Sequence, residues 1–251
     1  MASNFRHSAS SLAPHPPLRD YYQTEEQREQ LLATQFDHVA HDYNWITQAS
    51  SFGSGKWYRR EALKRSELTE GNTILDVACG PGTVSVCAQH IVGETGRVIG
   101  LDPSLGMVTE AQKQGVSTVL QGKAEHLPFP DSIFDFISMG YALRHVTDLT
   151  LTFKEYLRVL KPGGRFVCLE FSRPVSAGFR KLYDWYSFHL LPWIGTVVAR
   201  DGTGVYEYLP ASIRNFPNQQ RLCEMLKDAG FETVDYDNLT GGIVAIHVAV
   251  K

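Results

Sequence analysis

Short apolar runs alternate along the chain with segments whose apolar residues recur at helical spacing. Helices are predicted at about Val84–Ile91, Leu105–Lys113 and Leu149–Leu160. The apolar runs between and around them predict five strands: Thr73–Val77, Arg97–Leu101, Ser117–Gln121, Phe134–Met139 and Arg165–Phe171. Strands that alternate with helices form a mostly parallel sheet that is covered on both faces. The chain is therefore predicted to be an α/β protein.

The last part of the chain breaks this alternation. Phe231–Asn238 and Gly242–Val250 are two strand-like runs, and the connection between them is too short for the helix that parallel neighbours need. They are expected to pair as an antiparallel hairpin. The pattern therefore predicts a seven-stranded, mostly parallel sheet that ends in an antiparallel hairpin, with helices on both faces. In such a sheet the ligand crevice lies at the carboxyl ends of the strands, where the strand order reverses.

The remaining segments suggest one domain with two additions. Residues 23–251 are predicted to be a single domain, because no segment within them has the composition of a linker. Helical spacing in residues 24–66 predicts N-terminal helices that pack on the body or lie over its ligand. Residues 172–230 are a long insertion rich in aromatic residues. Residues 1–22 are rich in serine and proline, and we expect a disordered or flexible tail.

Composition and charge narrow the class of partners. A net charge of −3 gives no electrostatic reason to expect nucleic acid, and no window reaches the roughly 20 apolar residues of a membrane-spanning helix. The four cysteines form no CxxC pair and have no histidines at metal-ligand spacing, so neither a metal site nor a disulfide framework is expected. Reduced thiols favour a cytoplasmic protein. A weak similarity of the first residues to an organelle transit peptide leaves the mitochondrial matrix open.

The segment ILDVACGPGTVSV, residues 74–86, runs from a strand into a glycine-rich turn. Asp76 lies at the end of the strand, and Gly80 and Gly82 let backbone amides approach a ligand. Asp102 ends the second strand, where a carboxylate can accept both hydroxyls of a ribose. Because Asp76 would repel a pyrophosphate, we expect a cationic nucleoside such as S-adenosylmethionine (SAM). Two alternatives stay open, namely a nicotinamide cofactor and an aspartate that only caps the following helix.

Several longer stretches carry a more specific signal. LDVACGPGT, AEHLPFPD, ALRHVTD, RVLKPGGRFVCLEFS, YSFHLLP, SIRNFP and LTGGIVAIH all lie between residues 36 and 251. In these stretches the chain resembles the C-methyltransferases of ubiquinone and menaquinone biosynthesis, the UbiE type. LDVACGPGT is shared by many methyltransferases. The stretches LEFS, YSFHLLP, SIRNFP and LTGGIVAIH are much closer to this family alone. The resemblance implies the Rossmann-like class I methyltransferase fold, SAM as methyl donor, and methylation of a ring carbon of an apolar quinone precursor.

The resemblance also implies positions in the cofactor site. Asp102 would hold the ribose, residues 123–125 the adenine, and Gly140 the methionine side. The full set of expected cofactor-binding residues is Tyr43, Asp76, Gly80, Gly82, Asp102, Pro103, Met107, Lys123, Ala124, Glu125 and Gly140. Lys123 departs from the Asn or Asp of the family. Because an ammonium donates but cannot accept a hydrogen bond, the backbone or Glu125 must serve the adenine amino group.

Arg144 and His145, which follow the fourth strand, are the candidate catalytic residues. An arginine can stabilise the oxyanion of a phenol, and a histidine that titrates near neutrality can take its proton directly or through water. Gly140, His145 and Asn44 depart from the family pattern, and these changes concern the acceptor more than the donor. The alternative for the pair is helix capping and a surface ion pair with Asp148.

Aromatic residues of the insertion are expected to form the wall of an acceptor pocket. An apolar aromatic substrate needs such a lid, with a few hydroxyl groups that orient its ring. The expected substrate-binding residues are Tyr141, Tyr183, Tyr186, His189 and Arg214. Phe179 and Leu182 lie on the same helical face and are expected to pack on the sheet instead.

Besides a nicotinamide oxidoreductase, three functions that use SAM remain open at this point. The first is a SAM-dependent C-methyltransferase of a quinone-type precursor. The second is a related methyltransferase recruited to another natural product, by C- or O-methylation. The third is a scaffold that binds SAM without catalysis, which the presence of Asp76, Asp102 and Arg144 disfavours. A homodimer and a peripheral contact with a membrane are also left open.

Overall fold

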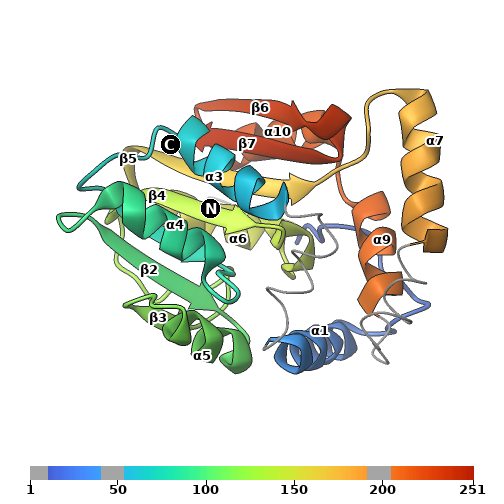
Figure 1. Ribbon diagram of the computed structural model, residues 1–251, viewed down its shortest axis with the longest axis horizontal. Coiled ribbons are helices and arrows are strands. Elements are labelled where there is room, and N and C mark those ends of the chain that lie inside the picture. Colours follow the sequence, from blue (N-terminus) through green and yellow to red (C-terminus); the bar gives the residue numbers. More distant parts are fainter. Residues whose placement is uncertain (1–10, 41–53, 191–204) are drawn as a thin grey trace, which may run out of the picture.

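A seven-stranded sheet in the order β3-β2-β1-β4-β5-β7-β6 forms the centre of the molecule (Figure 1). The computed structural model describes residues 11–40, 54–190 and 205–251. The strands are β1 (Thr73–Val77), β2 (Arg97–Asp102), β3 (Val119–Gln121), β4 (Phe134–Gly140), β5 (Leu160–Phe171), β6 (Thr233–Leu239) and β7 (Val244–Val250). The strands β1 to β5 are parallel, and β7 lies antiparallel between β5 and β6. The predicted fold class is thereby confirmed.

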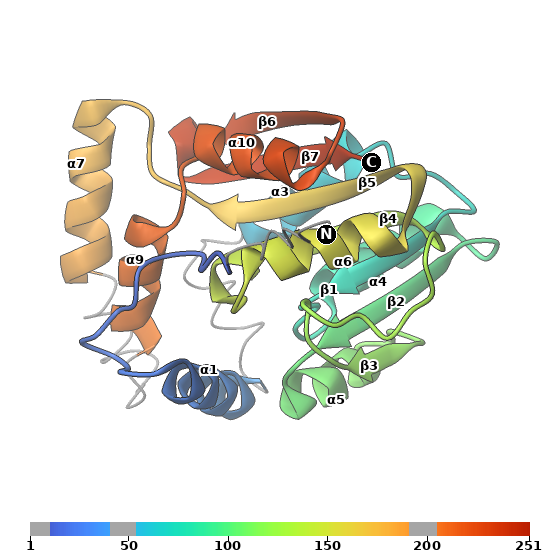
Figure 2. The ribbon, with the colours of Figure 1, turned by 180° about the vertical axis from the view of Figure 1, so that it is seen from behind.

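Helices cover both faces of this sheet. One face is covered by α3 (Ser54–Arg65) and α4 (Thr83–Val92), and the other by α6 (Leu149–Val159) and α10 (Gln219–Ala229) (Figure 2). α5 (Leu105–Lys113) packs against β2 and β3. Beyond the carboxyl ends of the parallel strands lie α1 (Glu25–Val39), α7 (Ala177–Trp185) and α9 (Val205–Asn215). Short helical turns are Leu143–His145, Tyr186–Leu190 and Thr240–Gly242.

Each face of the sheet has its own apolar core. Tyr156 of α6 and Phe166 of β5 are fully buried on one face, and their rings lie 4.8 Å apart. Leu63 of α3 and Ile74 of β1 are buried on the other face. Because helices cover both faces, the central strands are apolar almost throughout. Asp76, buried in β1, is an exception to that pattern.

The expected strands and helices are present, with shifts at their ends. The largest shift is in β5, which begins at Leu160, directly after α6, and not at Arg165. The proline and glycines of residues 161–164 do end the helix, as expected. However, Gly163 and Gly164 exchange hydrogen bonds with Lys251 at the end of β7, so this turn stays attached to the sheet. The final hairpin is confirmed by the antiparallel pairing of β6 and β7.

Residues 11–22, whose composition suggests a flexible tail, contact the body of the molecule in the structure. Leu12 forms two hydrogen bonds with the start of α6: its carbonyl accepts from the amide of Leu149, and its amide donates to Oδ1 of Asp148. His15 and Tyr22 are buried. The surface that these side chains bury favours packing of the segment against the body. Residues 1–10 lie outside the described part of the chain.

Candidate active site

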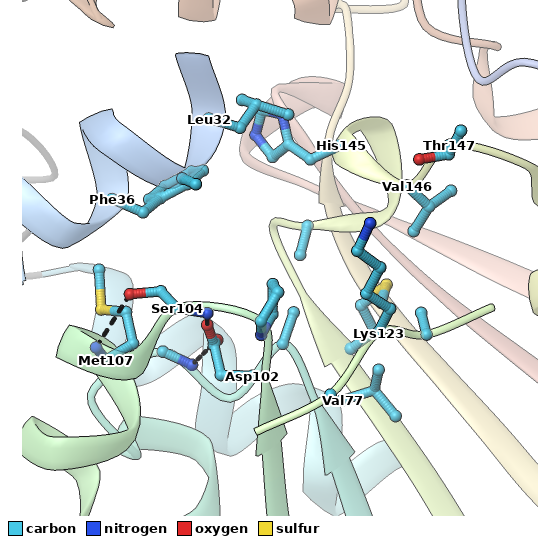
Figure 3. Close-up of a pocket in the computed structure, with 18 of the residues that line it drawn as sticks. Leu32, Phe36, Val77, Asp102, Ser104, Met107, Lys123, His145, Val146 and Thr147 are labelled. Carbon is cyan, nitrogen blue, oxygen red and sulfur yellow. Dashed lines mark hydrogen bonds between the residues drawn. The ribbon is translucent and has the colours of Figure 1, made fainter. Parts of the chain in front are cut away.

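A cavity of about 400 Å³ lies at the carboxyl ends of the parallel strands. The strand order reverses there, between β1 and β4, which is where ligands bind in open α/β sheets. Residues that follow β1, β2, β3 and β4 form the floor, and α1 forms the roof. Figure 3 shows Leu32 and Phe36 of α1 facing Asp102, Ser104 and Met107 across the cavity. Its size and its mixed apolar and polar lining suit one small-molecule site.

Asp102 at the end of β2 is the best-organised polar group of the floor. Its oxygens accept hydrogen bonds from the amides of Gly80, at 2.8 Å, and Ser104, at 2.9 Å. Burial raises the pKa of this carboxyl to about 6, while the two amides act in the opposite direction. The amides hold the carboxylate in place, and its remaining lone pairs can accept two ligand hydroxyls. This geometry is what the predicted ribose contact requires.

Asp76 lies behind the floor of the cavity and not in its wall. Only 1% of the residue is exposed, and its oxygens accept hydrogen bonds from the hydroxyls of Ser85, at 2.6 Å, and Ser138, at 2.7 Å. Burial raises the pKa of its carboxyl to about 6, and the two serines lower it. Asp76 therefore does not line the cavity, contrary to the direct contact with the cofactor that we expected. The charge of Asp76 acts on the cavity through space.

The two glycines of the turn after β1 have different tasks. Gly80 has φ +56° and lines the cavity, and its amide holds the carboxylate of Asp102. Gly82 has φ +84° and does not line the cavity. A Cβ atom at position 82 would lie 2.5 Å from Cγ2 of Val116. Gly82 therefore allows the start of α4 to pack closely against Val116. It does not line the cofactor cavity, contrary to our expectation.

The residues after β3 line the cavity as predicted, and they also contact the roof. Lys123 Nζ lies 2.8 Å from Glu29 Oε2 of α1, and both side chains are about half exposed. Glu125 is buried, and its Oε1 accepts a hydrogen bond from the amide of Thr147. The lone pairs that remain on Glu125 can accept from an adenine amino group, which Lys123 cannot do.

Most of the expected cofactor-binding residues come together at this cavity. Those that line it are Gly80, Asp102, Pro103, Met107, Lys123, Ala124, Glu125 and Gly140. Tyr43 lies outside the described residues.

The roof helix α1 is fixed at both ends. Near its start, the guanidinium of the buried Arg28 donates hydrogen bonds to the carbonyl oxygens on both sides of His145, at 3.2 and 3.0 Å. Near its end, Asp37 accepts hydrogen bonds from the hydroxyl of Ser104 and from the amide of Gly106. Of the two arrangements expected for the N-terminal helices, α1 adopts the one that covers the ligand space.

His145 lines the cavity, and its ring has unused hydrogen-bonding capacity. Both ring nitrogens are buried and lack a partner among the described residues. The ring stacks on Tyr208 at 5.8 Å and meets Phe36 edge-on at 5.5 Å. Burial, together with the positive charges of Arg144 and Arg28, holds the pKa of His145 well below 6.5. His145 is thus neutral at neutral pH, contrary to our expectation that it titrates there, and it offers one donor and one acceptor.

Arg144 does not line the cavity but lies one layer behind it. Its Nη1 donates to Glu170 Oε1, at 2.5 Å, and to the carbonyl oxygen of Tyr141, at 2.7 Å. Burial raises the pKa of Glu170, and the charge of Arg144 lowers it. The alternative of a surface ion pair with Asp148 is wrong, because Arg144 is buried and pairs with Glu170, whereas Asp148 caps α6. Arg144 can position Tyr141, but direct contact with an acceptor is not what this geometry provides.

Two non-glycine residues of the cavity wall have left-handed backbones. Ala78, after β1, has φ +52°, and Tyr141, after β4, has φ +61°. Such conformations cost free energy and persist where the surrounding structure holds them, often at functional sites. The ring of Tyr141 packs against Phe171, with centroids 4.4 Å apart. Among the predicted substrate-binding residues, Tyr141 is the one that lines the cavity in the described structure, and the left-handed turn holds it there.

The aromatic wall that we expected from the insertion is not part of this cavity. Tyr183 lies on α7, Tyr186 and His189 lie in the following turn, and none of the three lines the cavity. Arg214 is exposed, and its guanidinium lies 5.5 Å from the ring of Phe188. The physical reason is the path of the chain, because α7 stands apart from β1 and β2 in both ribbon views (Figures 1 and 2).

Several residues of the site were not predicted. Arg28 shares a helix face with Leu32 and Phe36, at spacings of i and i+4, so its place beside the cavity was detectable in the sequence. Glu170 is an acid at the end of an apolar strand, the same signal that identified Asp102. Ser138 gave no signal, because its role depends on the pairing of β4 with β1.

The strand order β3-β2-β1-β4-β5-β7-β6 with an antiparallel β7, together with the glycine turn after β1 and the carboxylate at the end of β2, defines a class I SAM-dependent methyltransferase. Two solved structures share the fold. Phosphoethanolamine N-methyltransferase 2 of Haemonchus contortus, in complex with SAM, is similar with a TM-score of 0.63 and 18% identity, over 89% of this chain and 59% of that one. The cyclase SpnF is similar with a TM-score of 0.65 and 17% identity, over 96% and 99%. These likenesses concern the fold alone.

The chain belongs to the ubiE/COQ5 methyltransferase family, whose model matches residues 23–251. It is 42% identical over 234 residues to the ubiquinone/menaquinone biosynthesis C-methyltransferase UbiE of Klebsiella pneumoniae, and the match covers 90% of this chain and 93% of the relative. The predicted family, enzyme class and methyl donor are thereby confirmed. The chain is a SAM-dependent methyltransferase.

None of the described helices is both long enough and apolar enough to cross a membrane. The described part of the chain has no group of three or more His, Cys, Asp or Glu side chains that could hold a metal ion.

Proposed function

We propose that this enzyme transfers a methyl group to a ring carbon of an apolar aromatic acceptor that resembles a quinone precursor. The observation that carries the proposal is the unpartnered, buried ring of His145 in the wall of the cavity, among the residues that the structure describes. A neutral imidazole between apolar neighbours can orient one hydroxyl of an otherwise apolar ring. The name of the relative, a C-methyltransferase of quinone biosynthesis, supports the same acceptor class.

In this proposal SAM lies along the floor of the cavity. Asp102 accepts the ribose hydroxyls, and the residues around Ala124 and Glu125 bind the adenine. The amino-acid end then points toward Gly140, on the β4 side. SAM supplies a methyl group on a positively charged sulfur, and the carboxylates of Asp76 and Asp102 give the floor the opposite charge.

The acceptor end is formed by the roof and by the residues after β4. Leu32 and Phe36 exclude water from above, and Tyr141 and His145 form the side. Holding two reactants in this way can supply roughly 7 to 11 kcal/mol of a barrier. His145 orients the acceptor hydroxyl, while Arg144 acts as a positioning residue through the carbonyl of Tyr141.

The test of this function uses the purified enzyme and SAM labelled in the methyl group. The acceptors are a prenylated hydroquinone and the same compound with both hydroxyls methylated. We expect label on a ring carbon of the free hydroquinone, located by NMR, and none on the blocked compound. Asp102→Ala should weaken binding of S-adenosylhomocysteine about 100-fold, because it removes a charged acceptor. The exposed Asp228→Ala is the control.

Different results would point to different functions. Label on an oxygen atom would show that the enzyme catalyses O-methylation and not C-methylation. Binding of S-adenosylhomocysteine with no transfer to any acceptor in a cell extract would indicate a scaffold. Binding of NADH without S-adenosylhomocysteine would overturn the proposal.

A second candidate is a related methyltransferase that acts on another natural product. The observation in its favour is that Lys123, Gly140 and His145, which depart from the pattern of the family, all line the cavity. Metabolites that accumulate when the gene is deleted distinguish the two candidates. A demethylated quinone precursor supports the first, and a different accumulating aromatic compound supports the second.

We also propose a cytoplasmic enzyme that touches a membrane surface through α7. Leu182 and Trp185 are 61% and 55% exposed on this helix, so Leu182 does not pack on the sheet as expected. A helix with such residues on one face can lie in a membrane interface. Cosedimentation with anionic vesicles tests this contact, and loss of binding in a Leu182→Ser/Trp185→Ser variant is expected. The homodimer stays a prediction, which the mass in solution tests.

A further inference from the structure

Arg59 of α3 is a cation beside the cavity that has no hydrogen-bond or ion-pair partner among the described residues. The carbon of its guanidinium lies 5.2 Å from the centre of the Tyr141 ring. Tyr141 lines the cavity and packs against Phe171 as well. A half-buried arginine that leaves its donors unused within the described structure is available for a ligand at the edge of this ring.

The charge of Arg59 reaches the β1 side of the cavity floor. It lowers the pKa of Asp76, whose carboxyl lies behind that floor, and it also acts on Cys87 of α4. Arg59 is therefore close to the junction of β1, α4 and the end of β4. With the ribose at Asp102 and the adenine on the β3 side, the amino-acid end of SAM extends toward this same junction.

The amino-acid end carries a carboxylate, and the cavity wall is otherwise unfavourable for it. Glu29, Asp102 and Glu125 line the cavity and would repel a second negative charge. Lys123 is a cation of the wall, but it lies on the β3 side and pairs with Glu29.

The buried arginines near the site are also engaged. Arg144 is paired with Glu170, and Arg28 with Glu25 and with backbone carbonyls. Neither can turn toward a new anion without breaking these contacts.

We propose that Arg59 binds the carboxylate of the methionine part of SAM. This proposal rests on the proposed position of SAM in the cavity. A guanidinium matches a carboxylate with two parallel hydrogen bonds, which a lysine cannot reproduce. The face of Tyr141, held by the left-handed turn after β4, keeps the guanidinium near the cavity before the ligand arrives.

The test compares two ligands that differ by this carboxylate alone. They are S-adenosylhomocysteine and its decarboxylated analogue, 5′-deoxy-5′-(3-aminopropylthio)adenosine. The wild type should prefer S-adenosylhomocysteine. Arg59→Ala should weaken S-adenosylhomocysteine about 10- to 100-fold, as loss of a charged hydrogen-bonded pair does, and leave the analogue nearly unchanged. Arg59→Lys should recover part of the preference, because it keeps the charge.

The control is Arg60→Ala, which removes the exposed neighbouring arginine and should keep the wild-type preference. Calorimetric titration gives the affinities, and thermal unfolding shows that each variant is folded. An equal loss for both ligands, or no loss for either, in Arg59→Ala would overturn the role of Arg59. If the wild type bound neither ligand, the proposed function itself would fail, so the two failures are distinguishable.

Discussion

Arg144 and Glu170 form an ion pair that is almost completely buried, with 3% and 2% of the side chains exposed. Each charge compensates the other in a region that water does not reach. A buried pair contributes little compared with well-packed apolar residues, but removal of one partner leaves an uncompensated charge. A loss of activity after substitution of Arg144 would therefore reflect the fold as well as the chemistry.

We expect Arg144→Met to lower the free energy of unfolding by about 3–5 kcal/mol, because Glu170 stays buried without its partner. The double variant Arg144→Met/Glu170→Gln should recover most of that loss. Urea unfolding followed by circular dichroism measures both values. Wild-type stability in the single variant would contradict the structural role of the pair and would favour a purely catalytic arginine.

At the residue scale, the sequence could place the groups that end strands. Asp102 and Gly80 were predicted because the carboxyl ends of parallel strands meet at one edge of the sheet. The partner of Arg144 was not predicted, because Glu170 reaches it only through the pairing of β4 with β5. The neutral state of His145 was also missed, since it depends on burial beneath α1 and not on neighbours in the sequence.

α1 connects three otherwise separate parts of the cavity wall. It contacts the turn that contains His145 through Arg28, the residue after β3 through the Glu29–Lys123 pair, and the start of α5 through Asp37. The surface pair contributes little, whereas the buried hydrogen bonds of Arg28 satisfy two carbonyl groups. Arg28 is thus the main polar attachment of the roof.

We expect Arg28→Met to loosen α1 without unfolding the sheet. Hydrogen exchange of the α1 amides should become faster by about a factor of ten, which corresponds to about 1.4 kcal/mol of local stability. Exchange in β1 and β4 should stay as in the wild type. The exposed Arg19→Met is the matched control. Uniformly faster exchange across the sheet would show that α1 is not a separate unit.

At the element scale, the alternation of strands and helices predicted the sheet and its final hairpin. These features depend on local periodicity, which a single sequence contains. The placement of the insertion was not predictable in the same way. An aromatic helix face indicates a surface to be covered, but the direction of the chain after β5 decides whether that face meets the cavity. In the structure, Phe36 of α1 takes the place expected for Tyr183 and Tyr186.

At the scale of the whole molecule, the fold holds two carboxyls with raised pKa values beneath one cavity. Burial raises the pKa of both Asp76 and Asp102 to about 6. Each raised pKa means that the folded state binds a proton more tightly than the unfolded state does. Stability is therefore lost as the pH rises from the unfolded value toward 6. This loss of stability accompanies the two carboxylates that give the floor its negative charge beneath a cationic ligand.

Asp76→Asn tests this trade between stability and binding. The unfolded pKa is 3.8 and the folded pKa about 6, so the destabilisation by Asp76 is absent below about pH 4 and complete above about pH 6. We expect the variant to be as stable as the wild type at pH 4 and about 2–3 kcal/mol more stable at pH 7. It should also bind SAM more weakly relative to S-adenosylhomocysteine, whose sulfur is uncharged, because the floor has lost one negative charge. Urea unfolding across this pH range and calorimetry at pH 7 measure the two effects. A variant that is less stable than the wild type at pH 7 would show that the hydrogen bonds from Ser85 and Ser138 outweigh the burial of the charge.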